Sequence, residues 1–164
     1  MGDKRPGTAG MDAGDNSVRG PAVQVGPNHP RRDSVLEGGR ELNWITGAIV
    51  DAGVQIHTKI GPGLLESVYE TILARELARQ GFHVDRQKSL SFEFEGMRFE
   101  NVARPDLVVD RTVVVEVKSV ARIPLAFEKQ VLTYLRILDL RVGLLLNFGA
   151  PLMKEGIKRI ANRL

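Results

Sequence analysis

The chain has 164 residues, of which 43% are hydrophobic, a formal net charge of +3 and no cysteine. This length allows one domain with a hydrophobic core. The lack of cysteine excludes disulfides and thiolate metal sites, so any metal would be bound by oxygen or histidine ligands. No apolar run approaches the roughly 20 residues of a membrane span, and the first residues lead into no apolar signal segment. We therefore expect a cytoplasmic protein without a membrane partner.

The charges are unevenly distributed along the chain. Residues 118–164 contain nine Lys and Arg against three Asp and Glu, whereas residues 41–117 contain eight against twelve. A basic C-terminal part could bind the phosphates of a nucleic acid. It could equally be a solvated surface, and the charge count does not choose between these interpretations.

The first 40 residues differ in composition from the rest. They contain eight of the 17 Gly and four of the eight Pro, and their apolar residues show no periodicity. Such a composition is typical of a disordered segment. We expect a disordered leader over residues 1–40 and a folded domain over residues 41–164.

Two helices are predicted at the start of the domain. Apolar residues recur at helical spacing from residue 41 to residue 59, and Gly61-Pro62-Gly63 interrupts the pattern. A second helix is predicted over residues 63–80, where Leu65, Val68, Ile72 and Leu77 mark one face and Gly81 follows.

The apolar period changes to two between residues 82 and 118. Alternating residues around a turn at Glu95-Gly96 predict an antiparallel hairpin with one solvated face. Residues 107–109 and 113–117 are apolar on both faces, with a turn at residues 110–112. These two strands should therefore be central in the sheet.

The remaining elements alternate between helix and strand. A helix is predicted over residues 125–138 after Pro124, a buried strand over residues 142–148 and a short basic helix over residues 152–162. The whole pattern predicts an α/β fold in which helices flank a mixed β-sheet, in the order α-α-β-β-β-α-β-α.

The strand at residues 113–118 has an unusual composition. It is apolar except for Glu116 and Lys118, which stand two residues apart and therefore leave the same face. Burying ionised groups costs several kcal/mol, by order of magnitude, unless a partner or metal compensates. This strand is therefore expected to form the floor of a site.

Asp106 can join this pair if the strand register allows it. When the pairing of the two central strands is centred on Arg111, Asp106 lies opposite Glu116, about 5 Å away between Cβ atoms. Adjacent carboxylates repel each other, which favours an oxygen-seeking cation such as Mg²⁺. A two-residue turn would put the carboxylates on opposite faces, and a buried ion pair with Lys118 is the alternative interpretation.

The sequence at this point resembles a known superfamily. Pro105-Asp106 followed by Glu116-Val117-Lys118 resembles the PD-(D/E)xK motif of a nuclease superfamily. The segment at residues 63–69, Gly-Leu-Leu-Glu-Ser-Val-Tyr, matches the signature of the bacterial GxxExxY family, which is assigned to that superfamily. The resemblance covers about residues 41–160 and implies a restriction-endonuclease-like fold and metal-dependent hydrolysis of phosphodiester bonds in DNA or RNA.

The resemblance also implies roles for individual residues. Asp106 and Glu116 would hold Mg²⁺ or Mn²⁺ by their side chains, and Val117 would contribute its backbone carbonyl. Lys118 would position or activate the attacking water. Glu66, on the second helix, would add a third acidic group.

Aromatic and amide side chains supply further candidates. Tyr69 shares a helical face with Glu66 and either hydrogen-bonds within the site or packs with a polar tip. Gln130 and Tyr134, four residues apart on the third helix, resemble the Gln-x-x-x-Tyr feature of RecB-like nucleases, although an ordinary amphipathic helix could also carry them. Phe127 stands where relatives would carry His.

Basic residues and partners complete the expectations. Arg86, Arg104, Lys129 and Arg136 are candidates for phosphate contacts, and each could instead be a solvated charge. A nucleic acid is the expected partner, and the short chain could also depend on a protein partner for substrate recognition. The alternative function is a non-catalytic nucleic-acid-binding or protein-interaction module that keeps the nuclease fold.

Overall fold

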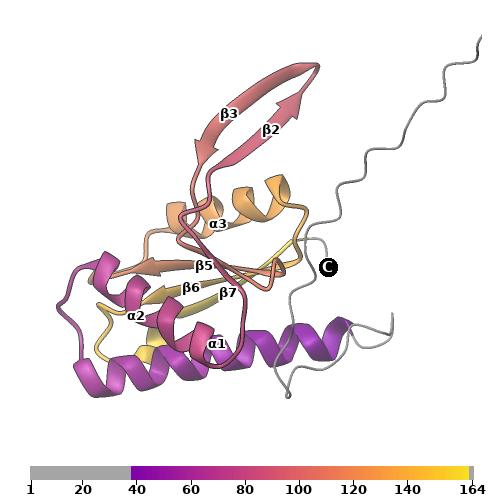
Figure 1. Cartoon of the computed structure of the whole chain (residues 1–164). Helices are drawn as coiled ribbons and strands as arrows, with labels where there is room; N and C mark the ends of the chain where they lie inside the picture. Colours follow the sequence, from indigo (N-terminus) through magenta and orange to yellow (C-terminus); the bar gives the residue numbers. More distant parts are fainter. Residues whose placement is uncertain (1–37, 163–164) are drawn as a thin grey trace, which may run out of the picture.

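The computed structural model describes residues 38–162, and Figure 1 shows how their elements are arranged. Of the predicted leader, residues 1–37 lie outside the described residues. The elements in chain order are α1 (Gly38–Ile60), α2 (Glu66–Arg79), β1 (Val84–Arg86), β2 (Leu90–Phe94), β3 (Met97–Ala103), β4 (Leu107–Val109), β5 (Val113–Lys118), α3 (Leu125–Ile137), β6 (Val142–Asn147), the 3₁₀ helix η1 (Met153–Glu155) and β7 (Ile157–Ala161).

Five strands form the main sheet in the order β1-β4-β5-β6-β7. Strands β5 and β6 are parallel and connected through α3, while the other neighbouring pairs are antiparallel. A parallel pair needs such a crossover, because a short turn cannot return the chain to the same end of the sheet. The predicted α/β class with a mixed sheet and central β4 and β5 is therefore confirmed.

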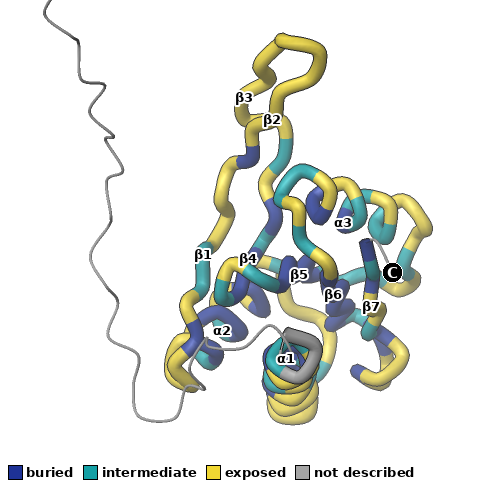
Figure 2. Tube along the Cα trace, turned by 90° about the vertical axis from the view of Figure 1, so that its right-hand side faces the viewer, coloured by how far each residue is buried: buried dark blue, intermediate teal, exposed yellow. Residues whose placement is uncertain are grey.

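Helices cover both faces of this sheet, as Figure 2 shows. Val113, Val115 and Val117 pack in the cluster that contains α1 and α2 residues, whereas Val114 packs with Val131 of α3. Side chains alternate between the faces of a strand. Glu116 and Lys118, which have the same parity as Val114, therefore lie on the α3 face.

The register of β4 and β5 decides where the acidic residues lie. Leu107 pairs with Val115 and Val109 with Val113, so the pairing is centred on Arg111. Asp110 and Arg111 adopt positive φ angles of 47° and 56° in the intervening turn. Extending this register by one residue places Asp106 opposite Glu116. The two carboxylates therefore lie on the same face of the sheet, as expected for a pairing centred on Arg111.

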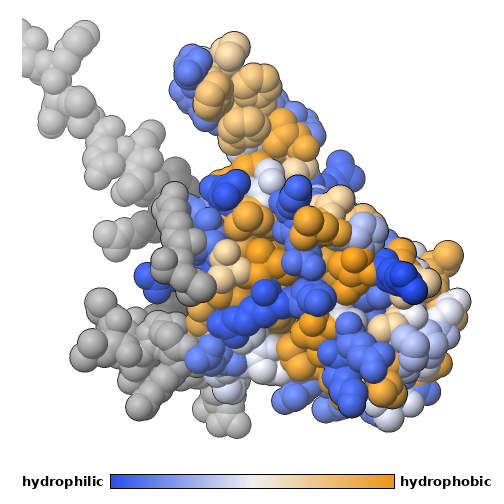
Figure 3. Space-filling view, turned by 180° about the vertical axis from the view of Figure 1, so that it is seen from behind, coloured by the Kyte–Doolittle hydropathy of each residue, from blue (hydrophilic) through white to orange (hydrophobic). Residues whose placement is uncertain are grey.

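Strands β2 and β3 form a separate two-stranded sheet, here called the arm (residues 90–103), which projects from the body in Figure 1. Its turn has positive φ at Glu95 (49°) and Gly96 (77°), typical of a tight hairpin turn. The predicted hairpin is confirmed. Its apolar face is not buried, however: Phe94 is 56% exposed, and Figure 3 shows apolar side chains gathered on the arm.

The predicted helix over residues 152–162 is wrong. This segment forms η1 and then β7, which pairs antiparallel with β6 and covers its open edge. Gly156 lies between the two, and a Cβ atom there would come within 2.3 Å of the Asn147 carbonyl oxygen. The basic composition suits an exposed edge strand as well as a helix. The segment forms a strand because β6 offers a free edge with which it can pair.

The helix boundaries shift by a few residues from those predicted. α1 begins at Gly38 rather than residue 41, and α2 begins at Glu66 rather than residue 63. Gly61 and Gly63 have φ angles of 77° and 115°, which are incompatible with a right-handed helix. This loop therefore makes Glu66 the first residue of α2.

We predict opposite effects for two Gly→Ala substitutions. At Gly143 of β6 a Cβ atom would lie 2.5 Å from Cγ1 of Val131 in α3. A β-branched side chain in a helix has little rotamer freedom, so Gly143→Ala should lower the free energy of unfolding by about 1–3 kcal/mol. Gly47→Ala in α1 meets nothing within 4 Å and should raise it by about 0.5–1 kcal/mol. Urea unfolding measures both, and equal effects would contradict this description of the α3–β6 contact.

Candidate active site

Two carboxylates lie side by side at the end of the central strands. Asp106 immediately precedes β4, and its Oδ2 accepts a hydrogen bond of 2.8 Å from the backbone N–H of Val117. Glu116 of β5 is only 3% exposed. Its Oε2 is buried without a hydrogen-bond partner among the described residues. A buried carboxylate oxygen normally has a partner, so this atom keeps its full acceptor capacity for a cation or a donor.

Burial raises the pKa of both carboxyl groups. For Glu116 the negative charge of Asp106 raises the pKa further, and the bond from Lys118 only partly opposes this. For Asp106 the hydrogen bonds from Val117 and Gln87 oppose the effect of burial without cancelling it. The two anions are thus poorly stabilised by the protein alone, which makes the pair a suitable site for a cation.

Lys118 supplies the nearest positive charge. Its Nζ donates to Glu116 Oε1 at 2.8 Å and lies 3.9 Å from Glu66 Oε2. Burial lowers the pKa of this ammonium, but the hydrogen bond to Glu116 and the nearby negative charges outweigh it, so the pKa is raised. Phe127 of α3 lies beneath the ammonium, with the ring centroid 5.0 Å away. Phe127 therefore gives this ammonium a cation–π contact.

Glu66 connects α2 to the end of β5. Its Oε1 accepts a 3.1 Å bond from the backbone N–H of Ser119, and the Ser119 hydroxyl donates to the carbonyl of Leu64 at 2.9 Å. As the first residue of α2, Glu66 also lies at the positive end of the helix dipole. The side chain is 44% exposed and faces Lys118.

Asn147 holds the chain that follows Lys118. This buried residue at the end of β6 accepts from the backbone N–H of Val120 at 2.9 Å and donates to the Val120 carbonyl at 2.8 Å. Its Oδ1 also accepts from the Gly149 N–H. The parallel ends of β5 and β6 are thereby joined, and the loop after Lys118 has a defined path.

Tyr69 does not face the carboxylates. It is fully buried, and its ring stacks on Phe148 with centroids 4.4 Å apart. Its hydroxyl donates to the Gly61 carbonyl at 2.6 Å and accepts from the Leu64 N–H at 3.2 Å. Of the two alternatives for Tyr69, the geometry supports packing with a polar tip, which holds the loop before Glu66.

Gln130 and Tyr134 project together from α3, as their spacing predicted. The Gln130 amide donates to the Tyr134 hydroxyl. Burial raises the pKa of Tyr134, the bond from Gln130 opposes it, and the charge of Glu116 raises it again. Tyr134 is therefore within electrostatic reach of the carboxylates, while Gln130 acts on Tyr134.

The four basic candidates fall into two groups. Arg86 binds Glu70 through Nε and Nη2 at 3.1 and 2.9 Å and also donates to Thr71, so its guanidinium serves an internal ion pair. These contacts favour a structural role for Arg86 over the predicted contact with phosphate. The other three are exposed at the surface: Arg104, Lys129 and Arg136.

Two residues near the site were missed from the sequence. Glu70 is only 6% exposed, and Gln87 donates to both Glu70 and Asp106. The position of Glu70, one turn after Glu66 and between the buried Tyr69 and Leu73, could have indicated a buried acid. Gln87 lies in a run of polar residues (86–89) at the end of a short strand, and no pattern distinguishes it from its neighbours.

The donor set fits a hard divalent cation. Two carboxylates and the Val117 carbonyl would offer only oxygen atoms, the ligands that Mg²⁺ and Mn²⁺ prefer, and Glu116 Oε2 is available. Within residues 38–162, however, no three acidic or imidazole side chains are grouped closely enough to bind a metal together. Glu66 contacts Lys118 and Ser119 instead of completing such a group.

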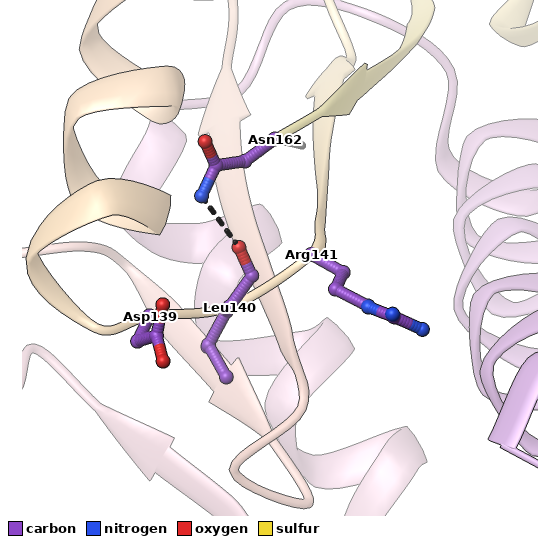
Figure 4. Close-up of a pocket in the computed structure, with 4 residues that line it drawn as sticks. All are labelled: Asp139, Leu140, Arg141 and Asn162. Atoms are coloured by element: carbon purple, nitrogen blue, oxygen red, sulfur yellow. Dashed lines mark hydrogen bonds between the residues drawn. The ribbon is translucent and has the colours of Figure 1, made fainter. Parts of the chain in front are cut away.

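A surface hollow lies at the other end of the sheet. It is lined by Asp139, Leu140, Arg141 and Asn162, and Asn162 donates to the Leu140 carbonyl at 3.1 Å (Figure 4). These residues precede β6 or follow β7, whereas Lys118 lies beside Asn147 at the far end of β6. The hollow is therefore not part of the site.

Comparison with known proteins identifies the class that this fold and site define. The model of the PD-(D/E)XK nuclease superfamily matches residues 43–160, and the chain belongs to this superfamily. No curated protein matches the chain. Among solved structures, that of SSO0001 has a TM-score of 0.40 and 13% identity, covering 73% of this chain and 66% of its own. None of the helices in residues 38–162 has the length and apolar content for a membrane crossing.

Replacing Lys118 should destabilise the protein in a pH-dependent way. Lys118→Met leaves Glu116 buried without its cation, which should cost about 3 kcal/mol at neutral pH. A carboxyl group whose folded pKa is raised destabilises the fold above that pKa, and this cost is lost as the pH falls from the folded pKa to the unfolded value of about 4.3. Urea unfolding at pH 7.5 and pH 5 should therefore show a smaller loss at pH 5.

The matched control for this substitution is Lys129→Met on the exposed face of α3. It should change the free energy of unfolding by no more than about 0.5 kcal/mol at either pH. An equal loss for Lys118→Met at both pH values would show that Glu116 is not the source of the destabilisation.

Tyr69→Phe tests the structural interpretation of that residue. Removing the hydroxyl leaves the Gly61 carbonyl and Leu64 N–H without their bonds, which should cost about 1–2 kcal/mol of stability. Divalent-metal affinity, measured by calorimetry on the folded variant, should stay within twofold of the parent. A loss of metal affinity of tenfold or more would instead place the Tyr69 hydroxyl within the site.

Proposed function

We propose that the protein is a metal-dependent nuclease that hydrolyses phosphodiester bonds of DNA or RNA. The observation that carries this proposal is Glu116 Oε2, a buried carboxylate oxygen that has no partner in the described part of the chain. Asp106 and Lys118 lie beside this carboxylate. A stabilising ion pair alone would use both carboxylate oxygens or expose one to water. A buried oxygen that no donor of residues 38–162 binds is better explained as a ligand position.

Asp106, Glu116 and the carbonyl of Val117 would hold Mg²⁺ or Mn²⁺. A cation bound there would neutralise the two carboxylates and polarise a phosphoryl oxygen of the substrate. Asp106 is prepared for this function by its bond from the Val117 N–H, which orients one oxygen while leaving further acceptor capacity.

Lys118 would act on the reacting phosphate. Its ammonium remains protonated and can donate to the attacking water or to the negative charge that grows on phosphorus. Glu66, 3.9 Å from Nζ, would orient this ammonium. The Phe127 ring of α3 also contacts the ammonium of Lys118 and would limit its movement.

Exposed basic side chains would hold the nucleic-acid backbone. Arg104 follows the arm two residues before Asp106, and Lys129 and Arg136 lie on α3, whose first turns carry Phe127. Such contacts are largely independent of sequence and weaken with salt. Gln130 would act indirectly, through the Tyr134 hydroxyl.

The finer family assignment is part of the proposal. Gly63, Glu66 and Tyr69 occupy the defining positions of the GxxExxY signature, and each has a distinct use. Gly63 has the positive φ of the loop, Glu66 binds Ser119 and faces Lys118, and Tyr69 holds the loop from within. The three signature residues thus act together to position Glu66, which supports membership of this family.

A nuclease assay tests the proposal. Purified protein with Mg²⁺ or Mn²⁺ should cleave at least one of single-stranded DNA, double-stranded DNA, branched DNA or RNA. Lys118→Ala should reduce the rate at least about 100-fold, as expected for loss of a group that stabilises transition-state charge. Lys158→Ala on the exposed edge strand β7 is the control and should retain the parental rate.

Circular dichroism must show that Lys118→Ala remains folded, and Asp106→Asn provides a second variant of the same site. Absence of cleavage of every substrate, together with no metal binding that depends on Asp106 and Glu116, would overturn the proposal. Salt-dependent association with nucleic acid that Lys118→Ala leaves unchanged, without turnover, would establish the non-catalytic binding module instead.

A further inference from the structure

Gln87 joins the site to a buried acid through its side-chain amide. Its Nε2 donates to Glu70 Oε2 at 2.8 Å and to Asp106 Oδ1 at 2.9 Å. A side-chain amide nitrogen has two hydrogen atoms. Both are therefore used on carboxylates, and Gln87 is the donor that allows two acidic side chains to approach the same point.

The backbone of Gln87 binds the same aspartate. Its N–H donates to the Asp106 carbonyl at 2.9 Å, so Gln87 contacts both the main chain and the side chain of Asp106. Gln87 also has a φ angle of 48°, a left-handed conformation that costs a non-glycine residue free energy. A strained residue held by three hydrogen bonds at the edge of a site is typical of a functional position.

Glu70 gives Gln87 a rigid anchor. Its carboxylate is buried in α2, and Oε1 accepts two bonds from the guanidinium of Arg86, leaving Oε2 for Gln87. Charge-assisted bonds from Arg86 on one oxygen and the Gln87 amide on the other hold the Glu70 carboxylate from both sides. Glu70 of α2, itself bound by Arg86 of β1, thus orients the Gln87 amide that donates to Asp106.

We propose that Gln87 is a positioning residue that sets the Asp106 carboxylate for a divalent cation. With Gln87 on Oδ1 and the Val117 N–H on Oδ2, each oxygen of Asp106 has one donor and retains acceptor capacity. The plane of the carboxylate is fixed from two directions. This inference rests on the proposed metal-dependent function and adds a residue that neither motif contains.

Calorimetric titration with Mn²⁺ on the full chain tests the inference. Gln87→Gly removes the side-chain amide, and glycine adopts the positive φ angle without strain. Any loss of metal affinity then reflects the missing side-chain bonds and not a strained backbone. Loss of a group that orients a metal ligand lowers metal affinity about 10–100-fold, and this range is the expected result. In the nuclease assay the rate at saturating nucleic acid should return as the Mn²⁺ concentration is raised.

The matched control is Asn101→Gly in the arm. Asn101 is also an exposed amide residue with positive φ, 56°. Its Oδ1 accepts from the Ser89 hydroxyl, so its side chain is bonded at the start of the arm and not to a carboxylate of the site. Its Mn²⁺ affinity should equal that of the parent. Should Gln87→Gly fail to fold, Gln87→Asn decides in its place, because Asn tolerates positive φ while its shorter side chain cannot donate to both carboxylates.

The outcomes separate this inference from the proposed function. If the parent binds Mn²⁺ and the Gln87 variant binds it equally well, Gln87 has only a structural role and the inference is overturned while the nuclease proposal stands. If the parent itself binds no Mn²⁺, the inference is overturned, and the nuclease proposal is overturned with it when the parent also cleaves no substrate. A tenfold or greater loss that Asn101→Gly does not share supports Gln87 as a positioning residue.

Discussion

Glu116 places a carboxylate in a central strand that is apolar apart from this residue and Lys118, and the surrounding structure compensates for it. Lys118 binds one of its oxygens, while the other has no partner in the described part of the chain. Burial and the charge of Asp106 both raise the pKa of this carboxyl group. Because a buried charge is costly without a partner, the site depends on an ammonium on one side and, in our proposal, a metal cation on the other.

The neighbouring elements hold these groups from three directions. The α2 start binds the loop after β5 through Glu66, and β6 binds the same loop through Asn147. From the third side, Gln87 links Asp106 to the buried Glu70, which is bound in turn by Arg86. The arm leaves the body between Gln87 and Asp106, so it begins and ends next to the candidate ligand set.

Much of this arrangement could be predicted because it follows from alternation along strands. Two charges at positions 116 and 118 must share a face, and a turn centred on Arg111 brings Asp106 opposite Glu116. The helical spacing of Gln130 and Tyr134 likewise brought them together. Residues 152–162 were predicted incorrectly, because their basic, partly apolar pattern fits a helix and an edge strand equally well, and pairing with β6 decided between them.

The sequence by itself determined the α/β class, the central strands and the resemblance of residues 63–69 and 105–118 to a nuclease superfamily, since these depend on local spacing. Only the tertiary structure decided which polar groups meet. Tyr69 lies beside Glu66 along α2 yet its hydroxyl binds the preceding loop, whereas Gln87, distant in sequence from Glu70, binds it directly. Such contacts depend on how α2 packs against β1 and β5, and no local pattern encodes that packing.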